Sequence, residues 1–255
     1  MSDQYVISMS GGIGSAASAL IAYEMNLDFC CVFADTLIED PDLHRFIADI
    51  DSVTRQTTIK LASGMTPWDV FIKKKYIGNT RTAHCSQVLK TDVVRAWIEE
   101  NCPDAILVLG MGQDEIERIE RARSKWAPIR VESLLMKRGM VSHCARTELI
   151  AKYGIKLPDL YSYGFPHNNC GGFCVRSGQS QFASLLKHFP DRYQYHVEQE
   201  GKCYEAIGET AKPFLRKMIA GKTEYMKLSD FRSKIESGEI TAEPYEWGGC
   251  SCFVD

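Results

Sequence analysis

The sequence predicts an α/β fold, Rossmann-like in arrangement, with a parallel sheet covered by helices on both faces. Two observations lead to this prediction. Short apolar runs alternate with helical patterns through the first 110 residues, which is typical of parallel strands joined by crossover helices. Glycine-rich or acidic residues follow directly after several of these runs, and ligands of parallel sheets bind beyond the carboxyl ends of the strands.

Four apolar runs are the predicted strands, and they span residues 5–9, 29–34, 57–61 and 105–109. An Ala-rich helical stretch, 15–25, follows the first run. After the second run, Asp40 and Pro41 are typical of a helix N-cap and the first helical position. Thr66 and Pro67 begin a further short helix, and apolar residues at helical spacing indicate a longer helix over 88–98.

The pattern changes after about residue 140. Helical patterns remain at 148–153, 182–186 and over much of 191–220, but a turn-rich stretch, 158–178, and the tail, 247–253, are dense in glycine and cysteine. We therefore expect a nucleotide-binding α/β domain over residues 1–140 and a C-terminal helical, Cys-rich appendage over 141–255.

Composition limits the class of protein. The 255 residues carry a net charge of −3 and contain no apolar stretch near the roughly 18 residues of a membrane helix. No basic leader precedes the first apolar run. We expect a cytoplasmic protein with no membrane association. A basic stretch, 117–138, is either a solvated face or a rim for phosphates or a polynucleotide.

The strongest local motif joins the first strand to the first helix. Its glycines allow a sharp turn that brings backbone N–H groups close to an anion, and the helix N-terminus adds further donors. It matches neither of the common P-loop and dinucleotide patterns. The candidate phosphate-binding residues are Ser10, Gly11, Gly12, Ile13, Gly14 and Ser15.

This loop resembles the S-G-G-x-x-S loop of the PP-loop superfamily, which contains the ATP pyrophosphatases and the phosphoadenylyl-sulfate (PAPS) reductases. Three further segments resemble elements of the same superfamily in the same order: Val32–Thr36 its F-x-D-T element, Cys85–Lys90 its C-x-x-x-x-K helix start, and Leu109–Glu115 with Arg118 its G-x-R-x-x-E-S-x-x-R element. The resemblance covers roughly residues 4–180.

The resemblance implies a fold of the adenine nucleotide alpha-hydrolase type that binds ATP or a related adenine nucleotide with Mg²⁺. Asp35 and Gly110 then lie beside the nucleotide, and Lys90 and Arg118 neutralise charge on its phosphates. One residue departs from the pattern, because many ATP-splitting members carry aspartate where this chain has Gly14.

Ten cysteines are many for a reducing compartment, where clustered thiols indicate metal binding or thiol chemistry. Cys170 and Cys174 form one close pair, and Cys250 and Cys252 form another. Cys85 lies at a predicted helix start. The resemblance to the superfamily implies that cysteines among these five bind a [4Fe–4S] cluster, with tetrahedral Zn²⁺ as the alternative. The other interpretation is that they are buried structural thiols.

Three functions stay open. The leading hypothesis is an AMP-forming ATP pyrophosphatase that adenylates an acceptor for sulfur transfer to a nucleic acid or nucleotide, with a nucleic acid or a sulfur-donor protein as partner. The second is an adenylyl-sulfate or PAPS reductase that forms sulfite. The resemblance would then make Cys252 the attacking thiol, although the tail lacks the glutamate and histidine of the reductases' E-C-G-x-H motif. The third is a non-catalytic nucleotide-binding module. A homo-oligomer is compatible with each.

Overall fold

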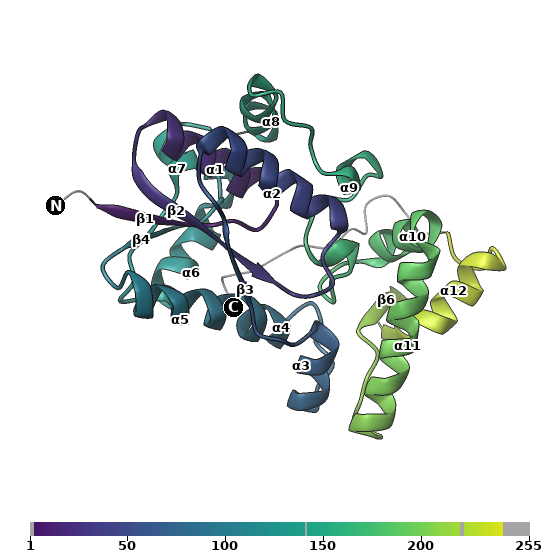
Figure 1. Ribbon diagram of the computed structural model, residues 1–255. Coiled ribbons are helices and arrows are strands. Elements are labelled where there is room, and N and C mark those ends of the chain that lie inside the picture. The colour runs from purple at the N-terminus through teal and green to yellow at the C-terminus, as the bar shows by residue number, and fades with distance from the viewer. Residues whose placement is uncertain (1–2, 141, 220–221, 242–255) are drawn as a thin grey trace.

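A five-stranded parallel sheet lies at the centre of the computed structural model, which describes residues 3–140, 142–219 and 222–241 (Figure 1). Its order is β3-β2-β1-β4-β5. The strands are β1 (Gln4–Ser8), β2 (Asp28–Asp35), β3 (Ile59–Ala62), β4 (Ile106–Val108) and β5 (Val131–Glu132). This doubly wound order confirms the predicted fold class. The sequence did not predict β5, because two residues are too few to show a periodic pattern.

Helices cover both faces of the sheet. On one face, α1 (Ile13–Glu24), α2 (Pro41–Thr54), α7 (Leu134–Lys137) and α8 (His143–Lys152) bury one apolar core. On the other face, where Figure 1 shows them, lie α5 (Asp92–Asn101) and α6 (Ile116–Trp126), which bury a second core. The predicted start of α2 is confirmed: the Asp40 carboxylate accepts a hydrogen bond from the backbone N–H of Asp42 at 2.9 Å, and Pro41 occupies the first helical position.

The chain between β3 and β4 forms α3 (Pro67–Lys74), α4 (His84–Ser86), one π-helical turn (Gln87–Thr91) and α5. The π-helical turn widens the helix just after Cys85 and contains Lys90. Turns of this kind are rare inside α-helices and are frequent at functional sites.

The C-terminal part packs on α3. It comprises α9 (Asp159–Ser162), α10 (Gln179–His188), α11 (Pro190–Ile207), the antiparallel pair β6 (Leu215–Ile219) and β7 (Lys222–Met226), and α12 (Leu228–Glu236). Trp68 and Phe71 of α3 share a third apolar core with these elements, whereas α8 packs on α1. A division of the chain between residues 140 and 141 stays a prediction.

The region around residues 208–219 differs from the sequence prediction, which had extended helical structure to about residue 220. The helix α11 ends at Ile207, because Gly208 has a φ of +79° and turns the chain out of the helix. The strand β6 then follows. Within the described residues, no helix is both long and apolar enough to cross a membrane.

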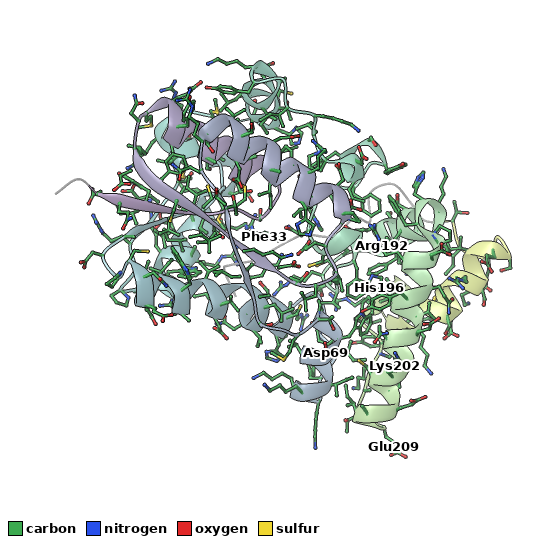
Figure 2. All side chains as sticks on the ribbon, viewed as in Figure 1. Phe33, Asp69, Arg192, His196, Lys202 and Glu209 are labelled. Carbon is green, nitrogen blue, oxygen red and sulfur yellow. The ribbon has the colours of Figure 1, made fainter. Side chains whose placement is uncertain are left out.

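Two residues of α11 connect it to the rest of the molecule, and Figure 2 shows both on the side that faces α2 and α3. Arg192 forms an ion pair with Asp40 at 2.8 Å and donates to the carbonyl of Gly171 at 2.7 Å. Burial lowers the pKa of His196 to about 3, so its neutral Nδ1 accepts a hydrogen bond from Trp68 Nε1 at 3.1 Å. The helix α11 thereby holds the glycine-rich cysteine turn against α2.

A buried carboxyl on α11 predicts a pH-dependent stability. Glu200 accepts hydrogen bonds from Leu228 N at 2.8 Å and Tyr204 Oη at 3.2 Å, yet burial raises its pKa from 4.5 to about 7. Between these pH values the folded protein holds a proton that the unfolded chain releases. The contribution of Glu200 to the free energy of unfolding therefore falls as pH rises, by up to about 3 kcal/mol. We expect urea unfolding at pH 5 and pH 8 to show a smaller loss of stability for Glu200→Gln than for the wild type; equal losses would contradict this.

Candidate active site

A pocket of about 450 Å³ lies where the strand order reverses, between β1 and β4. Parallel sheets bind ligands at this point, because the flanking crossovers leave in opposite directions and open a crevice beyond the strand ends. The loop after β1, the segment after β4, and residues of α6, α8 and the turn after α9 form its walls. Among the lining residues are Ser10, Gly12, Ile13, Gly14, Ser15, Gly110, Asp114, Glu115, Arg118, His143, Arg146, Tyr161, His167 and Asn169.

Hydrogen bonds within the loop after β1 fix its shape. The Ser15 hydroxyl donates to the carbonyl of Gly12 at 2.9 Å and accepts from Ser10 N at 3.2 Å. The N-cap residue of α1, Gly12, has no side chain to cap the first turn, and the Ile13 N–H donates a hydrogen bond to Tyr161 Oη at 3.4 Å. A helix N-terminus without a side-chain cap presents backbone donors and the positive end of its dipole to the pocket.

The glycines of this loop have different roles. Gly11 has a φ of +73°, and a Cβ there would lie 2.5 Å from Leu43 Cγ. A Cβ on Gly14 would lie 2.1 Å from the backbone oxygen of Gly110. No residue larger than glycine fits at position 14 without moving the segment after β4, so an aspartate at this position is incompatible with this backbone. Gly12 is different, because a Cβ there would make only ordinary contacts.

Two arginines supply positive charge to the pocket. Arg118 of α6 forms an ion pair with Glu115, and Arg146 of α8 forms one with Asp114. Both arginines keep a buried Nε that has no hydrogen-bond partner among the described residues. Sequence reasoning identified Arg118 but missed Arg146, because a single arginine in an ordinary helical pattern carries no local signal.

The turn after α9 forms a wall of the pocket, and sequence reasoning assigned it no role in binding. His167 faces the pocket, and its Nδ1 is buried with no hydrogen-bond partner within the part of the chain that is described. Burial and the nearby charge of Lys90 lower the pKa of His167 to about 4. The imidazole is therefore neutral at pH 7 and can donate or accept a hydrogen bond toward a bound ligand.

A second, smaller pocket of about 30 Å³ lies on the other side of this turn. Three of the predicted metal ligands, Cys85, Cys170 and Cys174, line it together with Lys90 and Arg176. These cysteines come from segments about 85 residues apart in the chain, so the fold brings them to one place.

A buried ion pair lies beside these thiols. Lys90 Nζ is 3.8 Å from Glu39, whose side chain is 1% exposed. Glu39 also accepts hydrogen bonds from the Thr36 hydroxyl, at 2.8 Å, and from the backbone N–H of Cys170. Burial raises the pKa of Glu39, an effect that Lys90 opposes. Lys90 thus lines the cysteine pocket, and the expected contact between Lys90 and bound phosphates stays a prediction.

Asp35, expected beside the nucleotide, is buried at the end of β2 but lines neither pocket. Its carboxylate accepts from Leu37 N at 2.7 Å and forms an ion pair with Lys60 at 2.7 Å. The carboxylate that caps α2 is that of Asp40. A contact between Asp35 and a bound nucleotide stays a prediction.

The predicted metal site also stays a prediction. Over residues 3–140, 142–219 and 222–241, no three His, Cys, Asp or Glu side chains are arranged to hold an ion. Cys250 and Cys252 lie outside the described residues, so their convergence with Cys170 and Cys174 is untested.

With this geometry established, comparison with known proteins identifies the family. Residues 4–208 match the family of the phosphoadenosine phosphosulfate reductase domain. The chain belongs to this family. A similar solved structure is the phosphoadenylyl-sulfate (PAPS) reductase from Candida auris in a phosphate complex, with 11% identity and a TM-score of 0.46 over 65% of this chain and 79% of that one. No curated protein sequence matches the chain significantly.

Proposed function

We propose that this member of the PAPS reductase domain family is an AMP-forming ATP pyrophosphatase that activates an acceptor for sulfur transfer. The observation that carries the proposal is the pairing of two pockets across one turn. The larger holds the glycine-rich loop and two arginines, and the smaller holds three cysteines. Asn169 lines the first pocket and its neighbour Cys170 lines the second, so one turn of the chain connects the nucleotide pocket with the thiols.

The larger pocket suits a triphosphate with its cation. The amides of the loop and the Nε groups of Arg118 and Arg146 are donors for phosphate oxygens. The carboxylates of Asp114 and Glu115 are the hard oxygen ligands that Mg²⁺ prefers, and Mg²⁺ would neutralise phosphate charge there. In the reaction an acceptor oxygen attacks the α-phosphorus, the bond to the bridging oxygen breaks, and pyrophosphate leaves. Sulfide from a separate donor then attacks the activated atom of the acceptor, and AMP leaves with the acceptor's original oxygen.

A second function is favoured by two observations. The family match and the glycine at position 14, where no carboxylate fits, suit a sulfonucleotide reductase, whose reaction does not split a triphosphate. A thiolate would attack the sulfonate sulfur of adenylyl sulfate or PAPS and displace the nucleotide. A second thiol would then release sulfite and leave a disulfide.

One pair of assays separates these functions. With Mg-ATP, sulfide and total cellular RNA as acceptor we expect release of pyrophosphate and AMP, and with adenylyl sulfate or PAPS plus a dithiol we expect no sulfite. Arg118→Met should lower kcat/KM about 100-fold, the usual cost of one donor to a transition-state oxygen. Its control is Arg121→Met, an arginine on the same helix outside this pocket. Release of sulfite without pyrophosphate would indicate the reductase. Release of neither product would indicate a non-catalytic binding module.

A further inference from the structure

A group of exposed cations lies at the C-terminal end of α3, in the loop that follows it and on β6. We call it the basic strip. It consists of three consecutive lysines at the end of α3, an arginine in the loop that leads to Cys85, and an arginine of β6, all of them exposed: Lys73, Lys74, Lys75, Arg81 and Arg216.

Hydrogen bonds join the separate parts of the basic strip. Arg216 donates to the Thr80 hydroxyl at 2.6 Å, which ties β6 to the loop after α3. Arg176, which lines the cysteine pocket, donates to the backbone oxygens of Thr80 at 3.0 Å and Arg81 at 3.4 Å. The loop that carries part of the basic strip is therefore also attached to the wall of the pocket.

The charges of the basic strip are not neutralised locally. Among the ion pairs of the described residues, none involves any of its five members. The one acid of α3, Asp69, bonds to Thr66 at the opposite end of the helix. A helix C-terminus favours cations and accounts for Lys73 and Lys74. It does not account for Arg81 or Arg216, in a protein whose net charge is −3.

Aromatic rings are exposed among these cations. Tyr76 follows the lysines directly and is 38% exposed, and its ring meets that of His84, the residue before Cys85, edge to face. Tyr225 is 52% exposed and pairs with Arg216 across the β6–β7 ladder, so both side chains lie on the same face. Cations bind phosphates, and exposed rings between them offer stacking surfaces for unpaired bases.

We propose that the basic strip docks a single-stranded stretch of nucleic acid and directs it toward the cysteine pocket. A membrane surface is the poorer fit, because Ile72, at 36%, is the one large aliphatic side chain exposed at this end of α3. The docking itself is independent of the reaction at the nucleotide. Only the role of the docked strand as sulfur acceptor rests on the proposed function.

The test uses a short fluorescein-labelled RNA strand and the matching DNA strand, with binding followed by fluorescence anisotropy across a salt series and without ATP. Lys73→Gln/Lys74→Gln/Lys75→Gln should weaken binding at least tenfold and reduce the slope of log K against log salt by about 2, since each phosphate contact to a single strand contributes about 0.7. Tyr76→Ala should weaken binding about tenfold, and Tyr76→Phe, which keeps the ring, should not.

The matched control removes three exposed charges elsewhere, in Arg55→Gln/Arg121→Gln/Lys187→Gln. We expect it to bind within about twofold of the wild type. Equal losses in both triple variants would show a general charge effect and overturn the proposal. So would wild-type binding to anionic lipid vesicles but to neither strand. Because the binding assay contains no ATP, its result does not depend on pyrophosphate release. A protein that releases no pyrophosphate can still bind the strand, and a protein that does not bind the strand can still release pyrophosphate.

Discussion

Gly12→Val is expected to reduce the affinity for ATP about 100-fold or more while the fold remains intact. A Cβ on Gly12 would lie 3.5 Å from Ser10 Oγ and 3.6 Å from Tyr161 Oη, both ordinary contacts, and φ is −96°. The backbone can therefore accept the side chain, at about 1 kcal/mol for a poor N-cap. The added methyl groups would occupy the pocket and separate the phosphates from at least two loop amides, each worth roughly 1.5–3 kcal/mol to a charged ligand.

Two further glycine variants make this result specific. Gly201→Val, in α11 with open space around it, should leave ATP binding unchanged. Gly14→Val should lower the Tm strongly, because its Cβ would collide with the backbone of Gly110. Calorimetric titration with ATP and thermal unfolding give the two readouts. Full ATP affinity in Gly12→Val would mean that the phosphates do not bind at this loop.

Lys90→Met is expected to destabilise the protein by about 3–5 kcal/mol, the usual cost of leaving one member of a buried ion pair alone. The Glu39 side chain is 1% exposed, and the variant removes the cation that is paired with its carboxylate. Without Lys90, burial would raise the pKa of Glu39 further. The folded variant would then hold a proton that the unfolded chain releases as pH rises, so the destabilisation should be larger at pH 8 than at pH 5.

The double variant Glu39→Gln/Lys90→Met provides the control. The neutral glutamine can still accept a hydrogen bond from Thr36, and no buried charge remains. We expect the double variant to recover most of the lost stability in urea unfolding. Its destabilisation should also be the same at pH 5 and at pH 8. A double variant as unstable as Lys90→Met would show that the lysine stabilises the fold through other contacts.

Much of the α/β layer could be predicted because its signals are local. The apolar run before Ser10 indicates β1, and the pair Asp40–Pro41 indicates the start of α2, each within a few residues. The turn from α11 into β6 was missed, since the helical pattern continues past Gly208 and tertiary packing of Leu215 in the third core decides the strand. The strand β5 was missed because its two residues are too few to form a recognisable pattern.

The candidate site was only partly predictable for a different reason. A glycine-rich turn and closely spaced cysteines are visible in sequence because the chemistry needs them as neighbours. Arg146 and His167 come from segments that meet the loop only after folding, and nothing beside them in the chain indicates it. Lys90 was identified as a functional cation, but its partner Glu39 and its place at the cysteine pocket required coordinates.

Nucleotide binding at the loop after β1 is tested most directly by a crystal structure with an ATP analogue that carries a methylene bridge between the α and β phosphates. We predict phosphate oxygens within about 3 Å of the amides of Ile13, Gly14 and Ser15, the ordinary hydrogen-bond distance. We also predict that Arg118 and Arg146 turn their unpartnered Nε groups toward the same phosphates. Phosphates bound away from the crevice between β1 and β4, with the loop after β1 unliganded, would contradict the account.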